Sequence, residues 1–387
     1  MRAPNEIDFW RGFALATIFI NHVPGIFYER FTHRNFSLSD SAEMFVFLAG
    51  WSLRYVVSDP GRPVPAFRLV LRLVGRAVVI YAAQILITVL AIALIAAAAL
   101  YFDASPILEW HNAAAVFEEP VAAHIGLVLL SHQLGYFNIL PLYVVLMIGA
   151  PVIALLDRAS PWLLLAASLA LYVYALLGGL NLPTWPVEGR WFLDPLTWQL
   201  IFVLGFLIAA PDTGLGAFVR RHRQALRILA VPFVVAGGLA AWFHYSPDPL
   251  RVPDPKLFFM FDKTFLSPAR LVHAIALVGL FAGSFRYIAR PLPPLAGYLS
   301  MLGRNSLNVF CVGSVLSLAG QIARFEYGGG IGTDTVVIII GIVALGVTGW
   351  VSEWRERLRA RQEPQPSPSS SPQVSSPPVS SRRAQPT

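Results

Sequence analysis

The amino-acid sequence predicts an all-α polytopic membrane protein with about ten transmembrane helices in one bundle. Of its 387 residues, 56% are hydrophobic and only 13% are charged, whereas about 25% of the residues in a soluble globular domain are charged. Several apolar runs reach the roughly 20 residues that cross the hydrocarbon core of a bilayer as a helix. Polar breaks rich in Pro and Gly, such as SDPGRPVPAFR and ARPLPPLAG, separate these runs.

Each long apolar run is expected to form one span. The first run is not a cleavable signal peptide, because no small-residue cleavage site follows it. Residues 121–133 are apolar but too short to span comfortably, so we expect them to lie at the membrane interface. The expected spans lie near residues 8–26, 42–58, 77–100, 137–156, 162–180, 195–211, 228–244, 269–285, 298–320 and 334–352.

The chain is expected to divide into a transmembrane domain, residues 1–355, and a tail, residues 356–387. Most of the tail reads QEPQPSPSSSPQVSSPPVSSRRAQPT, which is rich in Pro and Ser and has no apolar pattern. Such a segment cannot bury enough apolar surface to offset its ordering entropy. We therefore expect the tail to be disordered.

The distribution of basic residues predicts the orientation in the membrane. With the N-terminus in the cytoplasm, 20 Lys and Arg residues fall on the inner side and eight on the outer side, as the positive-inside rule requires. Residues 101–136 contain four acidic residues and no Lys or Arg, as expected of an exported loop. Both termini are therefore expected in the cytoplasm, and the net charge of +7 reflects topology rather than nucleic-acid binding.

Several classes of site are excluded or lack a signature. The single cysteine, Cys311, rules out an internal disulfide and a cysteine-based metal site. The sequence contains no HExxH motif, no P-loop and no GxSxG elbow. We expect no metal site and no tightly bound cofactor.

The stretch RGFALATIFINH, in the first expected span, contains polar residues that are costly in a membrane. Eleven helical residues make about three turns and rise about 16 Å, so Arg11 and His22 share one face. Asp8 is placed to pair with Arg11, and Asn21 adds to the polar cost beside His22. Ionisable groups inside a membrane usually mark a functional path. The alternative is that Arg11 extends to the headgroups and His22 caps a neighbouring carbonyl.

The second expected span opens with SDSAEMFVFLAGW. Glu43 would enter the membrane level with His22, where a carboxylate would orient the imidazole and raise its basicity. The alternative is that Asp40 and Glu43 cap the N-terminus of this helix.

Further basic and polar residues point to a polar interior. Arg68, Arg72 and Arg76 recur every four residues, a stripe that suits either anionic lipid headgroups or the phosphates of a nucleotide. Other embedded polar residues are individually typical of helix–helix hydrogen bonds, but together they indicate a hydrophilic chamber. They are Asn138, Gln199, Arg270, His273, Arg304, Asn305 and Asn308.

An arginine, ten intervening residues and a histidine on the first span resemble the membrane acyltransferase 3 family. The wider pattern is similar to one branch, the OpgC-type proteins, through residues 7–312. This resemblance implies a bacterial inner-membrane enzyme that moves a succinyl group from cytoplasmic succinyl-CoA to osmoregulated periplasmic glucans. The stretches that carry it are DFWRGFALATIFINHVPG, FTHRNFSLSDSAEMFVFLAGW, YFNILPLYVV, DPLTWQLIFVLG, FLSPARLVHAIAL and LGRNSLNVF.

The resemblance also implies roles for residues. His22 matches the motif histidine and would be the general base, and Glu43 lies where relatives carry an acidic residue. Arg11 matches the motif arginine and would hold the thioester arm, while Asn21 is a possible donor to the oxyanion. The other residues expected to bind CoA are Arg68, Arg72, Arg76 and Arg304, and those expected near the acceptor are Asp40, Asn138, Arg270 and His273.

Two alternatives to this function stay open at the level of sequence. The same chemistry would serve another envelope glycan, or an acetyl donor. A polar path with Arg and His would also serve a transporter of an organic anion, although no pair of Gly/Pro-interrupted half-helices indicates one. A covalent acyl-histidine and direct transfer are not distinguished either.

Overall fold

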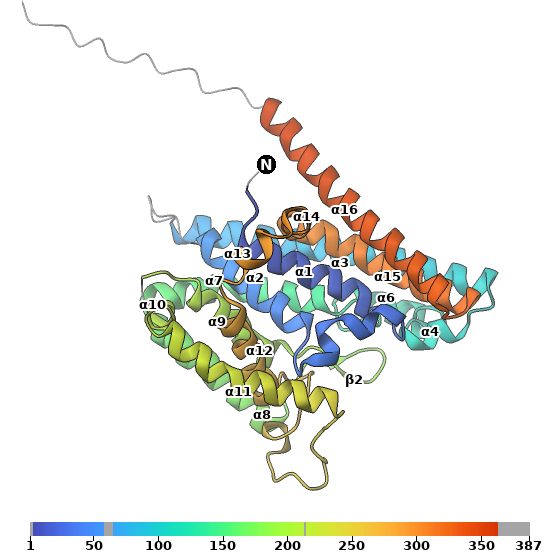
Figure 1. Cartoon of the computed structure of the whole chain (residues 1–387). Helices are drawn as coiled ribbons and strands as arrows, with labels where there is room; N and C mark the ends of the chain where they lie inside the picture. The colour runs from blue at the N-terminus through green and yellow to red at the C-terminus, as the bar shows by residue number, and fades with distance from the viewer. Residues whose placement is uncertain (1–2, 58–64, 213, 363–387) are drawn as a thin grey trace, which may run out of the picture.

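The computed structural model describes residues 3–57, 65–212 and 214–362, which fold as a bundle of α-helices (Figure 1). Among these residues, the strands are confined to one antiparallel ribbon that pairs Pro183 with Arg190 and Thr184 with Gly189. The prediction of an all-α protein is confirmed apart from this ribbon.

The chain forms α1 (Glu6–Asn21), η1 (Phe27–Phe31), η2 (His33–Phe36), α2 (Ser41–Val57), α3 (Ala66–Tyr101), α4 (Pro106–Trp110), α5 (Ala114–Glu118), α6 (Pro120–Val128), α7 (Ile139–Ala159), α8 (Pro161–Gly178), β1 (Pro183–Thr184), β2 (Gly189–Arg190), α9 (Pro195–Ile208), α10 (Gly214–Arg221), α11 (Arg223–Trp242), η3 (Lys256–Phe258), α12 (Pro268–Phe281), α13 (Phe285–Ala289), α14 (Pro293–Arg304), α15 (Ser306–Tyr327) and α16 (Ile331–Gln362).

Six of the described helices are long and apolar enough to cross a membrane, namely α3, α7, α8, α11, α15 and α16. The chain is therefore a membrane protein. α9 and α12 are apolar but have 14 residues each, and α1 and α2 have 16 and 17. Every expected span contains helix, but the expected number of about ten spans is not confirmed.

One expected span, 298–320, was wrong because the structure divides it into two helices. α14 ends at Arg304 and α15 begins at Ser306. Between them, the side chain of Asn305 donates to the carbonyl of Met301 at 2.9 Å. Asn side chains compete in this way with the main-chain ladder and end helices.

Glycines allow the helices that carry the site to pack at backbone distance. Gly12 of α1 and Gly303 of α14 each face a main-chain carbonyl of the other helix, and a Cβ at either position would overlap it. Gly50 of α2 and Gly205 of α9 meet in the same way. Small residues have this role at helix interfaces in membranes, and here they fix α1 and α2 within the bundle.

α9 supplies the centre of the apolar core. Its Trp198, Phe202 and Phe206 side chains are fully buried. The indole Nε1 of Trp198 still finds acceptors, the carbonyls of Lys263 and Thr264, each at 3.1 Å. This contact ties α9 to the loop that precedes α12.

α16 is a long helix that leaves the bundle towards its C-terminal end (Figure 1). Its 32 residues correspond to a length of about 48 Å. It continues to Gln362, so residues 356–362 are helical rather than part of a disordered tail. The rest of the expected tail, 363–387, lies outside the described residues.

Candidate functional site

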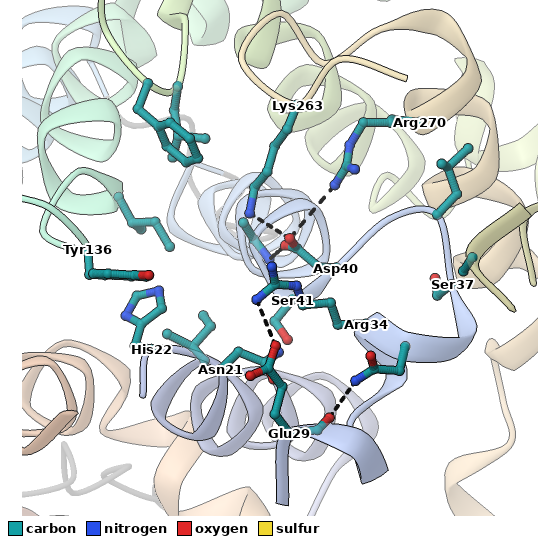
Figure 2. A pocket seen from close by; sticks show the side chains of 18 of the residues that line it. Asn21, His22, Glu29, Arg34, Ser37, Asp40, Ser41, Tyr136, Lys263 and Arg270 are labelled. Atoms are coloured by element: carbon teal, nitrogen blue, oxygen red, sulfur yellow. Dashed lines mark hydrogen bonds and ion pairs between the residues drawn. The ribbon is translucent and has the colours of Figure 1, made fainter. Parts of the chain in front are cut away.

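One pocket of the described residues has a volume of about 900 Å³ and lies at the end of α1 and the starts of α2, α7 and α12 (Figure 2). We call it the outer pocket, after the side of the membrane that it is expected to face. It brings together five of the residues expected at the site from four separate helices. These are Asn21, His22, Asp40, Asn138 and Arg270.

His22 is held in this pocket by its backbone. It follows the last residue of α1, its N–H donates to the carbonyl of Ile18 at 2.9 Å, and its carbonyl accepts from Nε2 of Gln321 at 2.6 Å. The ring Nδ1 is buried and has no hydrogen-bond partner among the described residues. The main chain of His22 is thus fixed, while its imidazole carries no carboxylate partner.

Tyr136 lies between two histidines at the pocket wall. Its ring centroid is 5.1 Å from that of His22 and 5.9 Å from that of His111. The φ angle of Tyr136 is +66°, a conformation that costs a non-glycine residue about 1–3 kcal/mol. His111 is buried and its Nδ1 donates to the carbonyl of Gly135 at 3.1 Å, which helps to hold this turn. The sequence pattern did not single out Tyr136, because a strained loop residue leaves no periodic signal.

Asp40 and Glu43 cap the N-terminus of α2. This is the alternative that the sequence left open for these two residues. Asp40 accepts the N–H of Ala42 at 2.8 Å, and Glu43 accepts the N–H of Asp40 at 2.9 Å. This reciprocal capping box satisfies two donors at the helix start. It also fixes the directions of both carboxylates.

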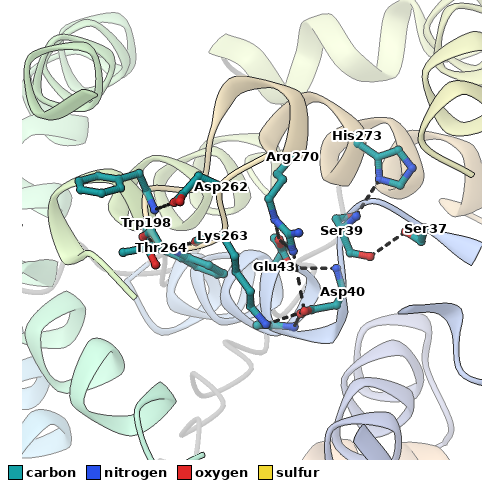
Figure 3. Close-up of polar contacts among 12 residues, drawn as sticks. Ser37, Ser39, Asp40, Glu43, Trp198, Asp262, Lys263, Thr264, Arg270 and His273 are labelled. Atoms are coloured by element: carbon teal, nitrogen blue, oxygen red, sulfur yellow. Dashed lines mark hydrogen bonds and ion pairs between the residues drawn. The ribbon is translucent and has the colours of Figure 1, made fainter. Parts of the chain in front are cut away.

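Glu43 pairs with Arg270 and not with His22, so the expected contact between Glu43 and His22 was wrong (Figure 3). Glu43 is fully buried, and its Oε1 accepts from Nε and Nη2 of Arg270 at 2.9 and 2.5 Å. The cation that pairs with Glu43 comes from α12, far along the chain. Helical periodicity along α2 does not show which helix supplies this partner.

Asp40 pairs with Lys263, a pocket residue that the sequence pattern did not identify. Lys263 Nζ lies 2.5 Å from Asp40 Oδ2, and Arg270 Nη2 lies 3.8 Å from the same atom (Figures 2 and 3). Burial would raise the pKa of the Asp40 carboxyl, but the charges of Lys263 and Arg270 outweigh burial and hold this pKa well below its usual range.

His273 is buried behind the pocket and does not line it. Its Nδ1 lies 2.9 Å from the hydroxyl of Ser39 and accepts the Ser39 N–H at 3.3 Å (Figure 3). His273 therefore positions the loop before α2, and its expected place near the acceptor stays a prediction.

The second pocket, which we call the inner pocket, has a volume of about 460 Å³. Arg11 of α1 and Arg72 and Arg76 of α3 line it together. These three residues were expected to hold the donor, and the structure brings them to one cavity. Two others expected there are not part of it. Arg68 is exposed outside the lining, and Arg304 forms an ion pair with Glu353 of α16 at 2.6 Å.

Arg11 turns towards α2, so its expected pairing with Asp8 was wrong. Its Nη2 donates to the carbonyl of Leu48 at 3.1 Å and to the hydroxyl of Ser52. Asp8 instead accepts from Nδ2 of Asn5 at 2.5 Å. The N-cap of α1 therefore uses the carboxylate that spacing alone assigned to Arg11.

Apolar helices of membrane length, which surround two pockets lined in part by charged side chains, indicate an integral membrane protein. The chain belongs to the OpgC protein family, whose model matches residues 3–357. The family indicates an acyltransferase that modifies glucans, and the resemblance to OpgC-type proteins is confirmed. No curated protein and no solved structure matches the chain.

Proposed function

We propose that this protein transfers a succinyl group from cytoplasmic succinyl-CoA to hydroxyl groups of periplasmic glucans across the bacterial inner membrane, with both termini in the cytoplasm. The observation that carries the proposal is the end-to-end order of the two pockets. α1, α2 and α7 each contribute to the inner pocket along one part of their length and to the outer pocket along another. A donor in one pocket and an acceptor in the other would meet beside His22.

The inner pocket supports an anionic donor. Arg11, Arg72 and Arg76 carry guanidinium groups that stay charged at any physiological pH, and no carboxylate lines this pocket in the described part of the chain. Such groups bind phosphates through charge-assisted, often bidentate hydrogen bonds. The phosphates of CoA suit this surface, and the acyl-CoA is a substrate that comes and goes rather than a resident cofactor.

The outer pocket supports a neutral, hydroxyl-rich acceptor. Its wall combines the rings of Tyr136 and Tyr245 with the polar groups of Asn138 and Ser246, and its cations are paired with carboxylates. Its volume of about 900 Å³ lies at the upper end of the range for small-molecule sites, about 300–1,000 Å³. A sugar ring at the end of a glucan fits these requirements.

His22, which lines the outer pocket, would act as the general base. Its imidazole takes the proton of the sugar hydroxyl as the oxygen attacks the thioester carbonyl. The C–S bond then breaks, and the CoA sulfur leaves and takes up a proton. Asn21 is the neighbouring amide proposed to donate to the oxyanion. Glu43 would act indirectly, because it holds Arg270 at the wall of the acceptor pocket.

Mass spectrometry of envelope glucans tests this function. A strain that carries the wild-type gene should show glucans heavier by succinyl groups, and a deletion strain or one with His22→Ala should lack them. An acetyl mass shift, or a shift on another glycan, would replace the donor or acceptor proposed here. Unchanged glycans with altered uptake of dicarboxylates would instead identify a transporter.

Thiol labelling tests the orientation. In a Cys311→Ser background, Glu118→Cys should react with a membrane-impermeant reagent in spheroplasts, and Arg221→Cys should not. Both positions are exposed in the structure. The opposite pattern would invert the assignment of inner and outer pockets.

A further inference from the structure

The two pockets approach within one helical turn of each other. On α2, Ala42 lines the outer pocket and Phe45 the inner one; on α7, Ile139 lines the outer pocket and Tyr143 the inner one. Three or four helical residues rise only about 5–6 Å. The barrier between the pockets is therefore about one side chain thick.

This barrier is aromatic. The Phe45 ring, 5% exposed, meets the Tyr143 ring edge-on with centroids 6.5 Å apart and lies 6.0 Å from the Phe310 ring. The three rings come from α2, α7 and α15, and Phe45 contacts both of the others. Beside them, the hydroxyls of Thr17 and Ser41 lie 2.6 Å apart and join α1 to α2.

A barrier at this place matters for the outcome of acyl transfer. Water in the outer pocket is a competing nucleophile for the same thioester. Its oxygen would attack the acyl carbonyl, the C–S bond would break, and free acid and CoA thiol would be released without any acylated sugar. Excluding water from reactive groups is a known function of closed active sites.

We infer that Phe45 is a specificity-determining residue that separates sugar acylation from donor hydrolysis. Its ring closes the passage between the inner and outer pockets to water and turns aside only when the acyl arm of a donor passes through. The chemical consequence rests on the proposed function, whereas the closed passage rests only on the geometry. Phe45→Ala would remove the one ring that touches both partners and open a gap large enough for water.

Cysteine accessibility tests the closed passage without any enzymatic activity. In the full chain with Cys311→Ser, Ala42→Cys marks the outer pocket and Ala49→Cys the inner one. A small, charged thiol reagent added to the outside of spheroplasts should label the first and not the second. Adding Phe45→Ala should expose Ala49→Cys, while Phe47→Ala should not, because the buried Phe47 on the same helix lines neither pocket.

Labelling of Ala49→Cys with Phe45 intact, no labelling after Phe45→Ala, or no labelling of Ala42→Cys would each overturn the inference. Phe45→Leu guards against misfolding, since a leucine keeps the site apolar and largely filled and should leave Ala49→Cys protected. If folded Phe45→Leu opens the passage as much as Phe45→Ala, a ring is not what closes it, and the inference also fails.

Thiol release measures the chemical consequence. The assay uses purified protein in nanodiscs with succinyl-CoA and no glucan. Phe45→Ala should release CoA thiol at least about tenfold faster than wild type, which corresponds to a hydrolysis barrier lower by about 1.4 kcal/mol. Phe47→Ala should stay at the wild-type rate. A faster rate in both variants, or in neither, would remove Phe45 as the determinant. Absence of all CoA turnover even after glucan is added, together with the expected labelling pattern, would instead refute the proposed function and leave the closed passage standing.

Discussion

The outer and inner pockets differ in how their charges are balanced. In the outer pocket the cations are neutralised by carboxylates, whereas in the described part of the inner pocket Arg11 donates to a main-chain carbonyl and a hydroxyl, Arg72 donates to a main-chain carbonyl, and no carboxylate is part of the lining. Elsewhere in the described bundle, Arg304 pairs with Glu353 at 2.6 Å and Arg324 with Asp334 at 2.7 Å, whereas Arg220 donates to the carbonyl of Pro211 at 2.7 Å and Arg223 to that of Ala282 at 2.7 Å. The outer pairs are Lys263–Asp40 at 2.5 Å, Arg270–Glu43 at 2.5 Å and Arg34–Glu29 at 3.3 Å.

This difference supports the two proposed ligands. Arg11 is half-buried and Arg72 and Arg76 are exposed, and no carboxylate of the described residues lines their pocket, so their guanidinium groups can bind an anion that arrives with the ligand. A balanced pocket favours a neutral polar ligand, since a charged one would leave an unpaired group. The two halves of the site are therefore complementary to the two proposed substrates.

The largest expected effect is on chemistry in the outer pocket. His22→Ala should lower acyl transfer by about 10²–10⁴-fold, the usual contribution of a positioned base. Donor affinity should stay unchanged, because His22 does not line the inner pocket. Initial rates and equilibrium donor binding measure the two effects separately.

The matched control for this prediction is His124→Ala, which removes an exposed histidine of α6 and should keep wild-type activity. Activity of His22→Ala within a few-fold of wild type would exclude His22 as the base.

The next expected effect is on stability and tests the charge balance of the outer pocket. Glu43→Gln removes the nearer of the two carboxylates beside the buried Arg270 and leaves only Asp40, 3.8 Å away, and breaking a buried pair costs up to about 3–5 kcal/mol. Denaturation in detergent should show this loss. Glu43→Gln with Arg270→Met removes both charges and should recover part of it.

Glu29→Gln is the comparison, since its partner Arg34 is 52% exposed and an exposed pair contributes about 0–1 kcal/mol. If Glu43→Gln keeps full stability and loses only turnover, the role of Glu43 is catalytic and the pairing with Arg270 is secondary.

A third effect tests the inner pocket. Arg72→Gln or Arg76→Gln should weaken succinyl-CoA binding by about 10- to 150-fold, since a lost charge-assisted hydrogen bond costs about 1.5–3 kcal/mol. Arg68→Gln removes the same charge from the same helix outside the pocket and should have little effect. Binding assays in nanodiscs give all three values.

A donor analogue without the nucleotide separates phosphate binding from lipid binding. It should bind the variants and the wild type equally in neutral and in anionic nanodiscs. Equal weakening for both donors, reversed by a change of lipid, would assign Arg72 and Arg76 to headgroups instead.

The sequence was informative where the signal is local. Apolar runs locate helices, and polar residues within them located Arg11, Asn21 and His22, because a costly side chain in a membrane segment needs a polar cavity. Spacing along α3 likewise identified Arg72 and Arg76 as neighbours on one face.

The partners of these residues were not predictable, because helical spacing fixes the face of a residue but not the helix opposite. Glu43 therefore pairs with Arg270 rather than His22, and Asp8 with the helix cap rather than Arg11. Lys263 and Tyr136 lie in loops, where no periodicity marks a site, so tertiary structure alone revealed them.

The last expected effect concerns Asp194, which follows Leu193 of the outer pocket and does not itself line that pocket. Asp194 caps α9, accepts from Thr197 Oγ1 at 2.9 Å, and its N–H donates to the carbonyl of Thr264 at 3.0 Å, beside Lys263. Burial raises the pKa of the Asp194 carboxyl to about 6. The folded state thus binds this proton more tightly than the unfolded chain, whose Asp pKa is about 3.9. The stability that this group contributes is present below about pH 4 and is lost as pH rises through about 6.

Asp194→Asn keeps a capping side chain that cannot titrate, so the fall in melting temperature between these pH values should be smaller than in wild type. The inner pocket provides the contrast, since its arginines do not titrate in this range, and Arg72→Gln should keep the wild-type slope. An identical pH slope in wild type and Asp194→Asn would show that the Asp194 carboxyl does not cause the pH dependence of stability.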